Sequence, residues 1–189
     1  MQGSIQLTSK IFWVSAAVAA LIDAGLLFLI LRLIRPERFI QIRVPVIVTA
    51  GVFWGILGVW LVRSFWVAYY QYFYPRWMGD WGIFVFGPGI GMILAIVFYW
   101  IIARFRSRPI PVFFALVGIE AFLEHLMGIY SFRIMDIPSF RGVSPLSVLV
   151  FSVPEYIFYW SLILLAAFLV QRACSRILLE TAIKQAPMA

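Results

Sequence analysis

The stretch GIEAFLEHLMGIY, residues 118–130, places two carboxyl groups and the only histidine of the chain inside a long apolar run. The whole run, residues 110–132, is long enough to cross a bilayer core, which needs about 20 apolar residues. A charged group at the bilayer centre costs at least about 2.5–3.5 kcal/mol, so Glu120, Glu124 and His125 need partners or a function there. The stretch predicts a membrane-spanning helix that carries a site.

The composition of the whole chain supports this interpretation. Of its 189 residues, 64% are hydrophobic and 12% are charged, a balance that a water-soluble domain could not bury. We therefore predict an all-α, polytopic integral membrane protein. A single cysteine, Cys174, excludes an internal disulfide framework and any cysteine-based metal site, and we expect no metal. The sequence does not identify a cofactor.

Five apolar runs predict a single domain with a bundle of five transmembrane helices. We expect spans over residues 11–34, 44–66, 82–105, 110–132 and 146–170, followed by a cytoplasmic tail over residues 171–189. Arginines concentrate after the first span, after the third span and in the tail, and loops of that kind stay in the cytoplasm. The predicted topology is N-terminus out and C-terminus in, in a prokaryotic inner (plasma) membrane. The net charge of +7 thus reflects contact with lipid headgroups, and we expect no nucleic-acid partner.

Two further patterns concern how the helices meet each other and the membrane surface. The connection over residues 64–82 is rich in Trp and Tyr, which predicts an outer interfacial segment or, alternatively, a lid over a lipid-entry cleft. Small residues at four-residue spacing predict close helix contacts. These residues are Ala16, Ala20 and Ala24 in the first span, Gly51 and Gly55 in the second, and Gly87 and Gly91 in the third.

The depth of each buried acid follows from the 1.5 Å rise per residue of a helix. Glu124 and Glu155 both lie about 12–14 Å below the outer boundary, and Glu120 and Asp23 lie about one turn deeper. Because a short connection joins the last two spans, we expect Glu124 and Glu155 to face each other across antiparallel helices. Glu120 and Glu124 share a helix face, whereas an ideal helix turns His125 about 100° away from Glu124.

Four roles remain open for these acids. They could form a structural network with Arg63 or Arg133, a proton or ion pathway, or a carboxylate metal site, although di-iron bundles use Glu-x-x-His pairs that this chain lacks. The fourth role is acid–base chemistry on an apolar lipid or isoprenoid, such as isomerisation or cyclisation, with aromatic faces stabilising a cation. The catalytic candidates are then Glu120, Glu124, His125 and Glu155, and the substrate-binding candidates are Asp23, Tyr130, Tyr156, Tyr159 and Trp160.

The stretch SVPEYIFYW, residues 152–160, resembles the Pro-x-Glu-Glu motif of small membrane lycopene cyclase domains, with Tyr156 in place of the second glutamate. The likeness covers fewer than ten residues, so we carry no family role over to this chain. The expected function is binding, isomerising or cyclising an apolar lipid at a buried acidic pocket. The alternative is a non-catalytic accessory subunit of a respiratory, photosynthetic or oxygenase complex, with membrane lipids and other membrane subunits as partners.

Overall fold

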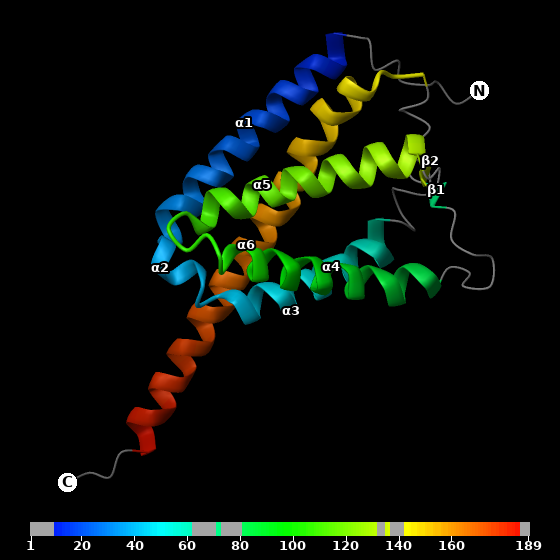
Figure 1. Ribbon diagram of the computed structural model, residues 1–189. Helices are drawn as coiled ribbons and strands as arrows, with labels where there is room; N and C mark the ends of the chain where they lie inside the picture. Colours follow the sequence, from blue (N-terminus) through cyan, green and yellow to red (C-terminus); the bar gives the residue numbers. More distant parts are fainter. Residues whose placement is uncertain (1–9, 62–70, 73–80, 132–134, 137–141, 186–189) are drawn as a thin grey trace.

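The computed structural model describes residues 10–61, 71–72, 81–131, 135–136 and 142–185, and most of this chain is helical (Figure 1). The elements are α1 (Lys10–Leu33), α2 (Pro36–Phe39), α3 (Arg43–Leu61), β1 (Gln71–Tyr72), α4 (Trp81–Ile102), α5 (Pro109–Phe122), the π-helix η2 (Leu123–Ser131), β2 (Met135–Asp136) and α6 (Pro145–Gln185). The two short strands pair antiparallel, with Gln71 opposite Asp136. The predicted helical class is confirmed.

A long helix lies at each of the five predicted apolar runs, and α5 and η2 together occupy the fourth. Within the described residues, two helices are long and apolar enough to cross a membrane, namely Pro109–Ser131 and Pro145–Glu180. Arg43–Ile56 and Gly87–Ile102 are shorter apolar helices. The five-span topology stays a prediction, and most of the aromatic segment 64–82 lies outside the described residues.

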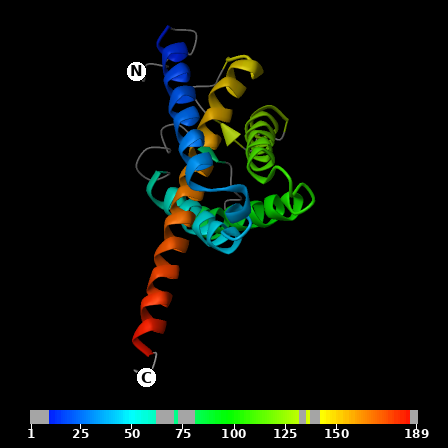
Figure 2. The ribbon, with the colours of Figure 1, turned by 90° about the vertical axis from the view of Figure 1, so that its left-hand side faces the viewer.

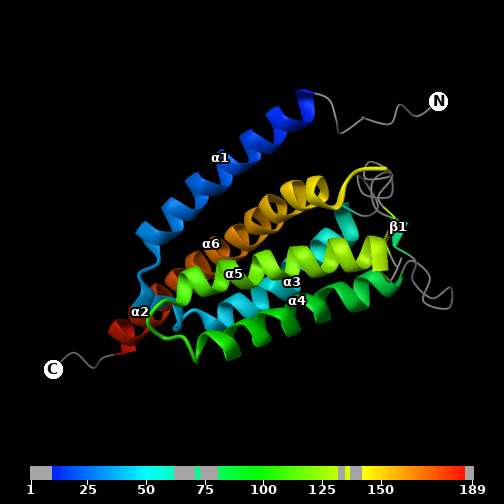
Figure 3. The same cartoon turned by 45° about the horizontal axis from the view of Figure 1, so that its top comes forward.

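Helix α6 organises the bundle, because α1, α3 and α5 all pack against it (Figures 1 and 3). Along α1, the first buried side chain among the described ones is that of Asp23. Before that residue the described side chains of α1 are exposed, whereas Ile30 and Ile34 are fully buried. Helix α4 lies on the far side of α3 from α6 and packs mainly against α3. A site on the inner face of α6 can therefore be reached by side chains from several helices.

Glycines bring α3 and α4 into close contact, as the small-residue spacing predicts. A Cβ atom added at Gly91 would collide with the Trp54 ring and would lie 2.9 Å from the carbonyl oxygen of Ala50. One added at Gly51 would lie 2.6 Å from Cγ of Met92. The same prediction fails at Ala20 and Ala24 of α1, which are exposed, and the side chain of Ala16 lies outside the described residues.

The last part of α6 extends well beyond the other helices (Figure 2). The last buried side chain of α6 is that of Phe168, and the described side chains beyond it are mostly exposed. The 17 residues from Phe168 to Gln185 add about 25 Å of helix at 1.5 Å per residue. The predicted span ends at residue 170, so the tail that follows it continues the same helix. We call residues 169–185 the α6 arm.

Candidate functional site

The candidate site forms where the helix of residues 109–131 changes its hydrogen-bonding pattern. The α-helical part ends at Phe122, and the next nine residues form the π-helix η2, which includes Glu124 and His125. A π-helix bonds residue i to residue i+5, so its turns are wider and its side chains share different faces from those of an α-helix. Such segments are rare and occur frequently at functional sites.

Two neighbouring residues of η2 contact the same side chain of α6. The Tyr156 side chain is hydrogen-bonded to the Glu124 carboxyl group. The His125 ring packs edge-on against the Tyr156 ring, with the centroids 5.3 Å apart and the planes at 82°. His125 is fully buried and Tyr156 is 3% exposed. The structure thus brings Glu124, His125 and Tyr156 together, although the 100° step of an ideal α-helix separates the first two.

Glu120 lies one turn before Glu124 and contacts Trp160. The indole Nε1 of Trp160 donates a 2.7 Å hydrogen bond to Oε2 of Glu120. Oε1 of Glu120 is buried and has no hydrogen-bond partner among the described residues. Glu120 and Glu124 are also close enough to repel each other electrostatically when both are ionised. Two neighbouring carboxyl groups in a low-dielectric interior disfavour each other's charged form.

The site is a ladder between two antiparallel helices. On α6, Ser152, Tyr156 and Trp160 recur every four residues and therefore lie on one face. Trp160 pairs with Glu120, and Tyr156, one turn earlier on α6, pairs with Glu124, one turn later on the facing helix. Behind this ladder, the Trp160 ring lies 5.4 Å from Phe113 and 5.2 Å from Phe98, measured between centroids. The acids are thus backed by a wall of aromatic rings.

Glu155 makes a different contact. Its Oε1 accepts a 3.1 Å hydrogen bond from the Tyr159 hydroxyl, one turn further along α6. The ring of Tyr159 lies 6.1 Å from that of Phe53 on α3, so this pair is on the α3 side of α6. Tyr156 and Tyr159 therefore each serve a different glutamate. A face-to-face Glu124–Glu155 pair stays a prediction.

The other predicted residues are Asp23, Tyr130, Arg63 and Arg133. Asp23 on α1 is 5% exposed, and its Oδ2 has no hydrogen-bond partner in the described part of the chain. The Tyr130 hydroxyl donates a 2.9 Å hydrogen bond to the carbonyl oxygen of Val143, which ties the end of η2 to the segment before α6. Arg63 and Arg133, the predicted cations, lie outside the described residues.

Sequence reasoning missed Trp54 and Ser152. The Trp54 ring of α3 lies 6.2 Å from the Tyr156 ring, and Ser152 is fully buried one turn before Tyr156. Trp54 Nε1 and Ser152 Oγ have no hydrogen-bond partner among the described residues. The four-residue spacing of Ser152 from Tyr156 is a signal that could have identified Ser152. Nothing in the sequence marks Trp54, whose ring packs against Gly91 of α4 as well as beside Tyr156.

The chemistry available at this site is proton transfer. The carboxyl groups of Glu120 and Glu124 and the imidazole of His125 can give or accept a proton, and Tyr156 and Trp160 add aromatic faces. No group of three or more His, Cys, Asp or Glu side chains in the described residues could hold a metal ion. Comparison of the chain with models of protein families, with curated proteins and with solved structures found no match.

Proposed function

We propose that this chain is a multi-pass membrane protein that binds an apolar lipid or isoprenoid and transfers protons to and from it. One observation carries the proposal: Glu124 and His125 of η2 both contact Tyr156, next to a buried Glu120 oxygen that has no hydrogen-bond partner among the described residues. A buried polar atom without a hydrogen bond costs stability, and a functional role would explain why the chain keeps it. The two helices that are long and apolar enough to cross a membrane support the membrane location.

The reaction class that fits these groups is isomerisation or cyclisation of a carbon–carbon double bond. A protonated carboxyl group of Glu120 or Glu124 would add its proton to one alkene carbon, which produces a carbocation. The faces of Tyr156 and Trp160 would stabilise that cation. The second carboxylate or His125 would then remove a proton from a neighbouring carbon. One proton enters and one leaves, so this chemistry requires no oxidant or reductant.

The test compares Glu124→Gln with the parent protein and with Glu180→Gln, a matched change at an exposed position of the α6 arm. Gln keeps the shape of the side chain and loses the titratable proton. We expect Glu124→Gln to stay folded but to change the apolar molecules that copurify, as measured by mass spectrometry of the gently solubilised protein. Identical bound molecules in all three proteins would contradict the proposal. The proposal would also be contradicted if no apolar molecule other than detergent copurified with the parent protein.

A second candidate is an accessory subunit of a membrane complex, and the α6 arm favours it. Ile177, Leu178 and Leu179 on the arm are 63–70% exposed, beyond the last buried residue of the bundle. Apolar side chains outside both a protein core and a bilayer usually contact another protein. The same mass spectrum separates the two candidates, because an accessory subunit would retain other membrane polypeptides in fixed stoichiometry.

A further inference from the structure

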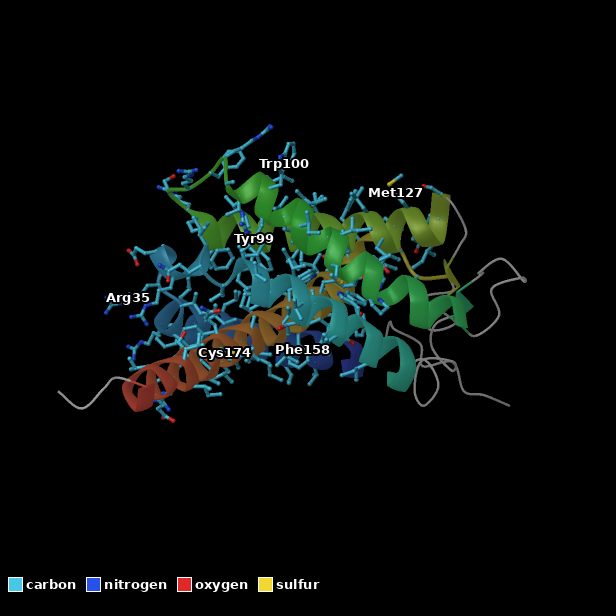
Figure 4. All side chains as sticks on the ribbon, turned by 90° about the horizontal axis from the view of Figure 1, so that it is seen from below. Arg35, Tyr99, Trp100, Met127, Phe158 and Cys174 are labelled. Carbon is cyan, nitrogen blue, oxygen red and sulfur yellow. The ribbon has the colours of Figure 1, made fainter. Side chains whose placement is uncertain are left out.

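Six exposed arginines come together from two connections that are far apart in the sequence. Arg35 and Arg38 lie in the segment that joins α1 to α3, and Arg43 is the first residue of α3. Arg104, Arg106 and Arg108 belong to the connection between α4 and α5. Glu37 is the only acidic residue within residues 35–43 and 103–108. Figure 4 shows Arg35 among several nitrogen-bearing side chains at one end of the bundle. We call this surface the arginine end.

The two connections are held together by contacts of α2. The Tyr99 hydroxyl on α4 donates a 3.2 Å hydrogen bond to the carbonyl oxygen of Phe39 on α2. The Phe39 ring stacks on the Tyr99 ring at 5.4 Å and meets the Phe113 ring of α5 edge-on at 5.5 Å. Phe39 is fully buried by these contacts. Arg38 of α2, and Arg35 directly before this helix, are therefore held next to α4 and α5.

Large apolar side chains are exposed in or directly beside the same two connections. Trp100 is 59% exposed, Phe105 is 55% exposed and Ile40 is 40% exposed. The guanidinium carbon of Arg104 lies 4.2 Å from the centre of the Trp100 ring, a cation–π contact. Aromatic and aliphatic groups next to basic ones favour the boundary between lipid headgroups and acyl chains. A nucleic-acid surface would provide the positive charge but has no need for the exposed apolar groups.

We propose that the arginine end binds the phosphate groups of anionic phospholipids. The planar guanidinium group pairs well with phosphate oxygens, and Trp100, Phe105 and Ile40 enter the acyl boundary beside it. The net charge of these two stretches is strongly positive, so zwitterionic headgroups are bound more weakly. This inference rests on the membrane location proposed above, but it does not depend on the acid–base chemistry.

The experiment measures lipid binding to the purified full chain by native mass spectrometry. The probes are phosphatidylglycerol and phosphatidylcholine with the same acyl chains. We compare the parent with Arg38→Gln/Arg108→Gln and with a control, Arg176→Gln/Lys184→Gln, which removes the same charge from the α6 arm. We expect the parent to prefer phosphatidylglycerol. An arginine near an anionic surface contributes about 1 kcal/mol, or about fivefold, so the first variant should lose about 25-fold in affinity for phosphatidylglycerol.

Three results would overturn the inference. They are equal affinity of the parent for both lipids, an equal loss in the two double variants, and displacement of phosphatidylglycerol by inorganic phosphate, which would assign the site to free phosphate. Alkaline carbonate extraction of cell membranes tests the membrane location separately, because a multi-pass protein stays in the membrane fraction whatever its lipid preference. The melting temperature of each variant in phosphatidylcholine checks that it is folded.

Discussion

At the residue scale, a 2.7 Å hydrogen bond joins Trp160 of α6 to the buried carboxyl group of Glu120. Trp160→Phe keeps an aromatic ring against Phe113 but removes the N–H group that serves Oε2 of Glu120. Because Oε1 already lacks a partner among the described residues, the variant leaves a buried carboxyl group without its indole donor. We expect it to lose about 1–3 kcal/mol of unfolding free energy, measured by denaturation in detergent.

The control for this prediction is the same substitution in a Glu120→Leu background. There the donor of Trp160 has no carboxylate to serve, so Trp160→Phe should cost much less than in the parent. The difference between the two backgrounds gives the coupling energy of the pair. Equal losses in both backgrounds would show that Trp160 matters through packing alone.

At the element scale, the fit of α4 against α3 depends on individual glycines. A Cβ at Gly91 would collide with Trp54, whereas a Cβ at Gly89, two residues earlier on the same helix, would meet nothing within 4 Å. We therefore expect Gly91→Ala to lose about 1–3 kcal/mol of stability through overpacking. Gly89→Ala should be neutral or slightly stabilising, because alanine favours the helix by roughly 0.5–1 kcal/mol.

Thermal unfolding of the two glycine variants in the same detergent gives this comparison directly. Since Trp54 also lies beside Tyr156, Gly91→Ala should in addition change the molecules that bind at the site. If Gly89→Ala destabilises as much as Gly91→Ala, the close contact of α3 with α4 is not what limits stability.

The elements show how far the sequence predicts this structure. Run length and composition placed the five long helices, because about 20 apolar residues and proline- or arginine-bearing connections define where a helix begins and ends. Glu120 and Trp160 could both be singled out as polar groups in an apolar run. The π-helix was not predictable, because a shift from i+4 to i+5 bonding depends on tertiary packing and has no pattern in the residues themselves. Both Glu124 and His125, which contact Tyr156, lie in this π-helix.

At the scale of the whole molecule, the proposed topology places the arginine end in the cytoplasm. Single cysteines at Ser107, between α4 and α5, and at Ser139, between η2 and α6, should therefore differ in labelling when Cys174 is replaced by Ser. A membrane-impermeant thiol reagent should label Ser139→Cys in intact cells and should reach Ser107→Cys only after the cells are opened, because basic connections stay inside. The reverse result would invert the topology.

The length of α6 has a mechanical consequence. Pro154 lies inside this helix just before Tyr156, and a proline removes one backbone hydrogen bond, which allows a helix to bend there. From that point to Gln185 the helix continues for 31 residues, roughly 46 Å. A bend of about 5° at Pro154, close to the glutamates, would therefore displace the far end of this helix by roughly 4 Å. A molecule that binds beside Tyr156 and bends the helix at Pro154 would thus move the exposed end of the α6 arm.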